Sequence, residues 1–287
     1  MKISVSSYSF NQYIKKGLLD HVSVVEKASQ MGFKAIEFID LPGENMEEQL
    51  EMAEKIKNKA DELGMVINAY TVSANLYWES EEENKAEVER LKRQVDVAKV
   101  LGAKVMRHDS CWILKKTGNG RSFDLMLPTI AKNAREISDY AQLNGIKTCT
   151  ENHGYIAQDS DRMERLFNAV NHDNYGLLVD VGNFACADED SCHAVSRLAP
   201  YAIYVHVKDF IKYNDSSQTN KKGFATRGMN FLEATAVGTG DIPVKKCIQI
   251  LKRAEYDGYV SIEYEGSDDC IEGIATGLKN LKEMIND

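Results

Sequence analysis

The feature that most constrains the fold of this chain is a repeated change in hydrophobic spacing. Short apolar or β-branched segments alternate eight times with longer stretches in which apolar residues recur at helical spacing. This alternation predicts parallel strands joined by helices, because a parallel strand connection needs a crossover that a helix supplies. Eight such units close a (β/α)8 TIM barrel, and this is the fold we expect.

The predicted elements follow the same order in every unit. We expect strands at residues 3–8, 35–39, 66–72, 104–108, 146–151, 176–181, 202–207 and 259–264. We expect helices at residues 18–31, 45–64, 82–101, 124–144, 160–172, 189–199, 243–256 and 271–285. No linker rich in proline or serine interrupts this order, so we expect a single domain that covers residues 1–287.

The long connections of the predicted barrel all lie on one side. Residues 72–81, 109–123 and 208–242 each follow a strand, whereas the turns from helix to strand are short. The elaborated loops therefore lie at the C-terminal ends of the strands, where active sites of barrels are built. The longest loop, 208–242, is expected to be functional or to act as a lid.

Composition narrows the class of protein. The net charge of −9 repels phosphate backbones, so nucleic acid is not an expected partner. No apolar stretch approaches the roughly 20 residues of a membrane span, and no signal-peptide pattern begins the chain, so we expect a cytoplasmic protein. The six cysteines form no C-x-x-C pair and are interpreted as reduced thiols.

Ligand-type side chains end four consecutive predicted strands in the second half of the chain. They are Glu151, Asp180, His206 and Glu263. Consecutive parallel strands of a barrel deliver their C-terminal ends to the same rim, so these four side chains are expected to converge. Three carboxylates and one imidazole suit a divalent metal, most of all Mn²⁺, with Mg²⁺, Co²⁺, Fe²⁺ and Zn²⁺ as alternatives.

Each of these residues has a simpler interpretation when it is considered alone. A strand-end acid is commonly a helix cap or a solvated rim residue, and a single histidine on a strand is commonly a hydrogen-bonded core group. Four of them on consecutive strands favour a shared metal, because burying them unpaired would cost several kcal/mol each.

Five segments in the second half of the chain resemble a known family. They are Glu151-Asn-His-Gly154, Val179-Asp-Val-Gly-Asn183, His206-Val-Lys-Asp209, Gly238-Thr-Gly-Asp-Ile-Pro243 and Tyr256-Asp-Gly-Tyr-Val-Ser-Ile-Glu-Tyr-Glu265. Together they resemble the sugar phosphate isomerase/epimerase family, which has the xylose isomerase-like TIM barrel. The resemblance implies that the four strand-end residues bind one divalent metal, often manganese, and that the first and last glutamates also move a proton. The ketose 3-epimerase branch has a histidine where this chain has Asn183.

The expected reaction is isomerisation or epimerisation of a ketose or related sugar by proton abstraction next to its carbonyl. Glu151 and Glu263 are the predicted acid and base. Two further histidines, His108 and His153, are candidates for a second base or a sugar ligand, with rim or supporting structure as the alternative. The candidate substrate-binding residues are Arg107, Asn183, Lys208, Trp112 and Arg227.

Three other functions fit parts of the pattern. The catalytic subunits of C-glycoside deglycosylases also resemble this family, so a metal-dependent lyase that eliminates from 3-keto-glycosides is an alternative, with His108 or His153 as base and a small accessory subunit. An AP endonuclease would need an Asp-x-His pair where this chain has Leu232-Glu-Ala234. A non-catalytic sugar-binding barrel would not need all four ligand-type residues. A carbohydrate is the expected partner in most of these cases, and a homo-oligomer stays open.

Overall fold

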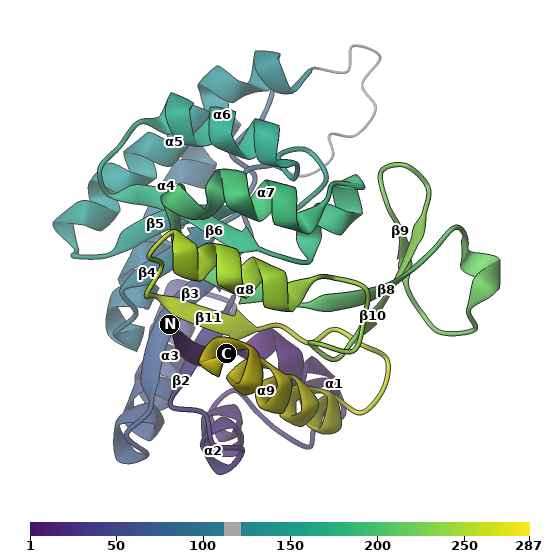
Figure 1. The fold of residues 1–287 in the computed structure, drawn as a ribbon. Helices are drawn as coiled ribbons and strands as arrows, with labels where there is room; N and C mark the ends of the chain where they lie inside the picture. The colour runs from purple at the N-terminus through teal and green to yellow at the C-terminus, as the bar shows by residue number, and fades with distance from the viewer. Residues whose placement is uncertain (112–121) are drawn as a thin grey trace.

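The computed structural model describes residues 1–111 and 122–287. Its centre is a closed barrel of parallel strands in the order β1-β11-β7-β6-β5-β4-β3-β2 (Figure 1). The barrel strands are β1 (Lys2–Ser6), β2 (Ala35–Ile39), β3 (Val66–Val72), β4 (Val105–His108), β5 (Lys147–Glu151), β6 (Tyr175–Asp180), β7 (Ala202–Val207) and β11 (Tyr259–Ile262). The predicted (β/α)8 fold is confirmed.

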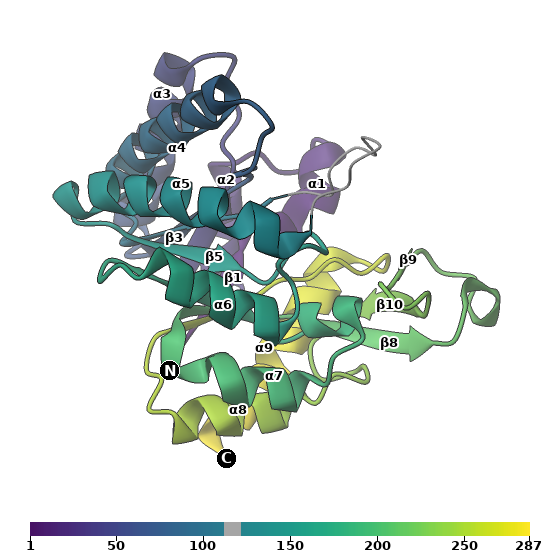
Figure 2. The same ribbon diagram turned by 90° about the horizontal axis from the view of Figure 1, so that it is seen from above.

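Helices surround the barrel and connect its strands (Figures 1 and 2). They are α1 (Asn11–Lys15), α2 (Ser23–Gln30), α3 (Met46–Glu62), α4 (Glu81–Leu101), α5 (Phe123–Leu143), α6 (Ser160–Val170), α7 (Ser191–Leu198), α8 (Val244–Arg253) and α9 (Cys270–Asn286). Short 3-10 helices are η1 (Ser7–Phe10), η2 (Asn183–Ala187), η3 (Ala199–Tyr201) and η4 (Ser216–Gln218). None of the described helices is long and apolar enough to cross a membrane.

The first unit differs from its predicted boundaries because of local hydrogen bonds. The Ser6 hydroxyl accepts a hydrogen bond from the backbone N–H of Tyr8 at 3.3 Å, so the chain turns into η1 where the strand was expected to continue. Helix α2 begins at Ser23 because the Asp20 carboxylate accepts from the backbone N–H of Ser23 at 2.7 Å. The early turn brings Tyr8 to the C-terminal mouth of the barrel.

The loop predicted at residues 208–242 contains a small antiparallel sheet. Strands β8 (Asp209–Tyr213), β9 (Phe224–Ala225) and β10 (Phe231–Thr235) form it in the order β8-β10-β9, and it projects beside the barrel mouth (Figure 1). The Asp209 carboxylate anchors its base by accepting four backbone N–H bonds, which come from Phe210, Gly238, Gly240 and Ile242. The sequence pattern did not predict these strands.

Side chains alternate between the inside and the outside of the barrel. Inside, Ala69, Cys149, Leu178 and Tyr204 form a buried apolar layer contributed by four different strands. Outside, strand residues such as Phe38 and Tyr70 pack in the larger core between barrel and helices. The interior layer supports the polar side chains at the C-terminal ends of the strands.

Candidate functional site

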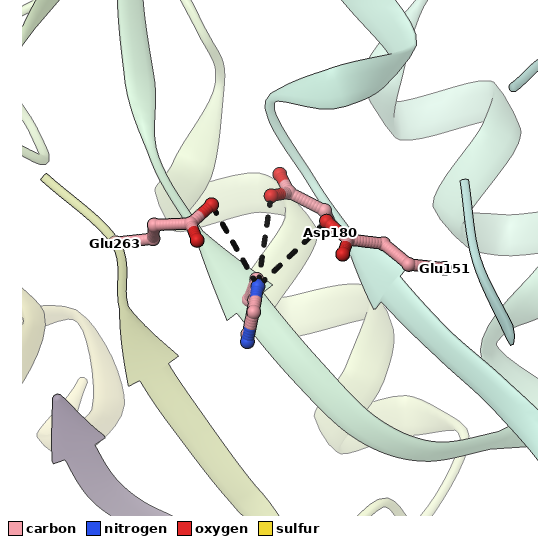
Figure 3. Close-up of side chains that lie close together, drawn as sticks. Glu151, Asp180 and Glu263 are labelled. Carbon is pink, nitrogen blue, oxygen red and sulfur yellow. Dashed lines mark ion pairs between the residues drawn. The ribbon is translucent and has the colours of Figure 1, made fainter. Parts of the chain in front are cut away.

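Four side chains from consecutive barrel strands meet just above the interior layer. One ligand-type atom from each of Glu151, Asp180, His206 and Glu263 lies within 4.8 Å of the others. The three carboxylates point toward one imidazole nitrogen, as Figure 3 shows. The distances from His206 Nδ1 to the nearest carboxylate oxygens of Glu151, Asp180 and Glu263 are 3.7, 4.0 and 3.8 Å.

The other face of the His206 ring is held by a glutamate from β2. His206 Nε2 donates to the Glu37 carboxylate at 2.8 Å, and both side chains are fully buried. The hydroxyl of Tyr204 also donates to Glu37 and accepts from Asn68 at 2.8 Å. A carboxylate behind a histidine fixes the tautomer that leaves Nδ1 as the ligand atom, which is the usual support of metal-binding histidines.

Two atoms of this group are unsatisfied in a way that fits a metal. His206 Nδ1 and Asp180 Oδ2 are buried side-chain atoms without a hydrogen-bond partner. Burial would lower the pKa of His206, but the charge of Glu37 and the hydrogen bonds to Glu151 and Glu37 raise it well above its usual value. A divalent cation would replace a proton on Nδ1, because both are stabilised by the same surrounding carboxylates. The donor set therefore fits a hard or borderline divalent ion.

Arg107 and Asn183 hold the Glu151 carboxylate from two sides. Arg107 forms an ion pair with Glu151 and a second with Asp109 at 2.8 Å. The Asn183 side-chain amide donates to the other Glu151 oxygen at 2.9 Å. Burial alone would raise the pKa of Glu151, but the Arg107 charge and the neighbouring His206 hold it well below its usual value. Glu151 is thus kept ionised, and Asn183 orients it.

Lys208 neutralises the opposite side of the site. Its ammonium group pairs with Glu263 and lies 3.2 Å from Asp180 Oδ2 and 3.9 Å from Glu265 Oε1. Burial would raise the pKa of Glu263, but the charges of Lys208 and His206 lower it. Lys208 is itself 5% exposed, so these pairs are shielded from water and are strong.

A polar cavity of about 300 Å³ opens above these residues at the C-terminal mouth of the barrel. Its walls come from most of the barrel strands and the loops that follow them. The lining residues are Tyr8, Ile39, Asp40, Thr71, Ser73, Arg107, Asp109, Glu151, His153, Lys208, Glu263 and Glu265. Metal-ligand candidates thus lie at the base of a space that a small molecule can enter.

His153 and His108 are placed very differently. His153 lines the cavity, and its Nδ1 lies 2.8 Å from the Asp109 carboxylate. Burial would lower the pKa of His153, but the hydrogen bond and the charge of Asp109 raise it. His108 follows Arg107 on β4 and lies against the Tyr175 ring, 6.4 Å between centroids. It does not line the cavity, because neighbouring strand residues face opposite sides, so the expected contact between His108 and substrate is wrong.

The remaining predicted substrate contacts also differ from expectation. Asn183 is 3% exposed and contacts Glu151, so it lies behind the ligand set rather than in the cavity. Arg227 lies on the projecting sheet and is held by Asp159 at 2.8 Å and by the carbonyl of Tyr155, outside the cavity lining. Trp112 lies outside the described residues.

Sequence reasoning did not assign several residues of the site. Glu37 was missed, although an acid in the middle of the apolar segment Ala35–Ile39 was a visible signal. Asp40 and Tyr8 line the cavity from connections that carry no motif. Glu265 was noticed as a strand-end acid but was given no role. All of them lie near the metal-ligand candidates only through the closure of the barrel.

Glu37→Gln is expected to weaken divalent-metal binding by about 10–100-fold, because the amide no longer accepts a charge-assisted bond from His206. Direct titration of the purified protein with Mn²⁺, followed by calorimetry, measures this change. Glu44→Gln, at an exposed position beyond β2, is the matched control. Unchanged affinity in Glu37→Gln would mean that the Glu37–His206 bond does not support a metal ligand.

Comparison with known proteins agrees with this architecture. Residues 25–284 match the family model of the xylose isomerase-like TIM barrel. Inosose dehydratase of Clostridium perfringens (strain 13 / Type A) is 24% identical over 138 residues, which are 48% of this chain and 46% of that protein. The matched segment thus spans about half the length of the curated relatives.

Two solved structures share the fold over their whole length. The IOLI protein with a bound zinc atom has a TM-score of 0.77 and 16% identity, covering 100% of this chain and 98% of the other. D-psicose 3-epimerase of Clostridium cellulolyticum H10, solved with D-tagatose, has a TM-score of 0.76 and 13% identity, covering 99% of both. Because the family model spans nearly the complete barrel, this chain belongs to the xylose isomerase-like TIM barrel family.

Proposed function

We propose that this protein is a divalent-metal-dependent enzyme that removes a proton next to the carbonyl of a sugar. The observation that carries the proposal is the convergence of Glu151, Asp180, His206 and Glu263 within 4.8 Å at the base of a polar cavity. The zinc in one structural neighbour and the sugar in another support a metal and a carbohydrate. Mn²⁺ is the metal to test first, because oxygen ligands predominate.

A bound ion would stabilise the negative charge that develops on the carbonyl oxygen as the proton leaves. The residues of the chain supply the proton transfer. Glu151 and Glu263 both line the cavity, and they approach His206 from different strands. Arg107 and Lys208 keep the two carboxylates in the ionised form that accepts a proton. Return of the proton by the second glutamate completes an isomerisation or epimerisation.

A second candidate reaction is the elimination of water from the same kind of sugar. The half-length similarity to inosose dehydratase favours it, and so does the pairing of His153 with Asp109 on the cavity wall. In this reaction the C–H bond next to the carbonyl and a C–O bond on the adjacent carbon break, and a C=C bond forms. A proton from His153 would join the departing hydroxide to give water.

The test is to incubate the Mn²⁺-loaded protein in D₂O with a panel of ketoses and keto-sugars and to follow the products by NMR. Isomerisation or epimerisation exchanges a carbon-bound proton for deuterium and returns a sugar of the same composition. Elimination gives an unsaturated product that absorbs in the ultraviolet. The absence of both outcomes across the panel, in protein that binds Mn²⁺, would contradict the proposal.

His153→Gln separates the two reactions. If the enzyme dehydrates its substrate, this variant lowers product formation by about 10²–10⁴-fold while deuterium exchange continues, because only the leaving hydroxyl loses its proton donor. Product formation and exchange are measured in the same NMR sample. The exposed His193→Gln on α7 is the control. Equal loss of both signals would contradict a role for His153 at the leaving group.

A further inference from the structure

The cavity contains two polar atoms that the described residues leave without a partner. Thr71 Oγ1 and Arg107 Nε are buried and make no hydrogen bond within the described part of the chain. Both residues line the cavity, and they are 6% and 5% exposed. A buried polar atom without a partner costs about 1–3 kcal/mol, so these positions call for hydrogen-bonding atoms of a ligand. They lie on β3 and β4, on the side of the cavity where no metal-ligand candidate is found.

A fixed acceptor continues this side of the cavity toward the mouth. Asp40 Oδ2 accepts from the Ser73 backbone N–H at 2.9 Å and from the Ser73 hydroxyl at 2.5 Å. Arg90 holds the Ser73 carbonyl at 2.6 Å and is itself paired with Glu87 at 2.8 Å. Asp40 is therefore positioned before any ligand arrives, and its carboxylate can accept further bonds from hydroxyl groups.

The charges of the cavity oppose an anionic ligand. Five carboxylates line it, from Asp40, Asp109, Glu151, Glu263 and Glu265. Among the described lining residues, the lysine and the arginine are both committed: Arg107 pairs with Asp109 and Glu151, and Lys208 pairs with Asp180 and Glu263. A phosphate or carboxylate on the substrate would meet like charges at close range.

The usual phosphate position of a barrel is also occupied by a side chain. Phosphate sites of TIM barrels commonly use the last loops and a helix N-terminus, whose free N–H groups bind the oxygens. The Asp269 carboxylate accepts from the first amides of α9, Ile271 at 2.9 Å and Glu272 at 3.2 Å. These amides are not available to a ligand.

We propose that the substrate is a small, uncharged polyhydroxy ketone without phosphate, whose hydroxyls away from the four ligand residues bind Asp40, Ser73 and Thr71. This substrate class rests on the proposed function. The cavity volume of about 300 Å³ is at the lower end of small-molecule sites, which suits a single sugar unit. Neutral hydroxyls satisfy the unpaired atoms and add no charge to the carboxylate-lined wall.

Matched pairs of ketoses and their terminal phosphate esters test the proposal in Mn²⁺-loaded protein. Deuterium exchange measures turnover, and calorimetry measures binding. We expect kcat/KM to be about 100-fold or more higher for the neutral sugar, because like-charge contacts cost several kcal/mol. Equal or better use of the phosphate ester would overturn this proposal and leave the proposed function standing. If neither member of any pair binds or exchanges, both proposals fail.

Variants test the Asp40 subsite. Asp40→Ala is expected to raise KM for the neutral sugar by about 10-fold or more with little change in kcat, because it removes a binding contact rather than a reacting group. Asp40→Asn keeps one acceptor oxygen and should have a smaller effect. The exposed Asp173→Asn at the opposite end of the barrel is the control. An unchanged KM in folded Asp40→Ala would overturn the subsite.

Discussion

Glu151→Gln is expected to abolish turnover, with a loss of at least about 10²–10⁴-fold in kcat, while some metal binding remains. The amide keeps one oxygen that can face His206 and can still contact Arg107, but it cannot accept the proton of the substrate. Stopped or steady-state kinetics on the best sugar of the panel, together with Mn²⁺ titration, measure both quantities.

The position of Glu151 makes this variant informative. Its two oxygens already contact Arg107 and Asn183, so the substitution changes the chemistry of one atom inside a fixed frame. Glu62→Gln, whose side chain is 65% exposed at the end of α3, is the control for a change of charge elsewhere. Wild-type-like rates in Glu151→Gln would exclude this residue as acid or base.

Removal of divalent metal is expected to eliminate activity and to lower thermal stability. Mn²⁺ at about 100 times its Kd would stabilise the folded state by about 2.7 kcal/mol. For a chain of this size, that corresponds to a rise in Tm of roughly 5–10 °C. The reason is that an ion would counter the mutual repulsion of the Glu151, Asp180 and Glu263 carboxylates around His206.

Thermal unfolding with chelator, and then with Mn²⁺ added back, measures this effect, and metal analysis of the purified protein accompanies it. His206→Ala is the matched variant, because it removes the one nitrogen ligand and should lose the response to Mn²⁺. If the wild-type protein neither contains metal nor responds to Mn²⁺, a non-catalytic sugar-binding barrel becomes the better interpretation.

Much of the site depends on pairs that form across strands. Arg107 was expected to contact substrate, yet it pairs with Asp109 and Glu151, and Lys208 pairs with acids on β6 and beyond β11. These pairs explain why a basic residue at a strand end is not by itself an anion site here. They also set the charge of the cavity on which the substrate class depends.

The barrel and the four ligand residues were predictable from the sequence alone. Hydrophobic spacing is a local property, and each of Glu151, Asp180 and His206 is the last or next-to-last residue of an apolar strand. Parallel strands with short returns leave one arrangement for their C-terminal ends, so residues far apart in the chain could be assigned to one rim.

Tertiary structure decided which neighbours these residues have. Glu37 reaches His206 because closing the barrel brings its strand, β2, opposite β7, and no spacing in the sequence relates the two. His108 and Arg107 are adjacent in the chain, but strand register turns one toward the helices and the other toward Glu151. Local patterns set the period of a strand, whereas the partner of each side chain depends on contacts between strands that are distant in sequence.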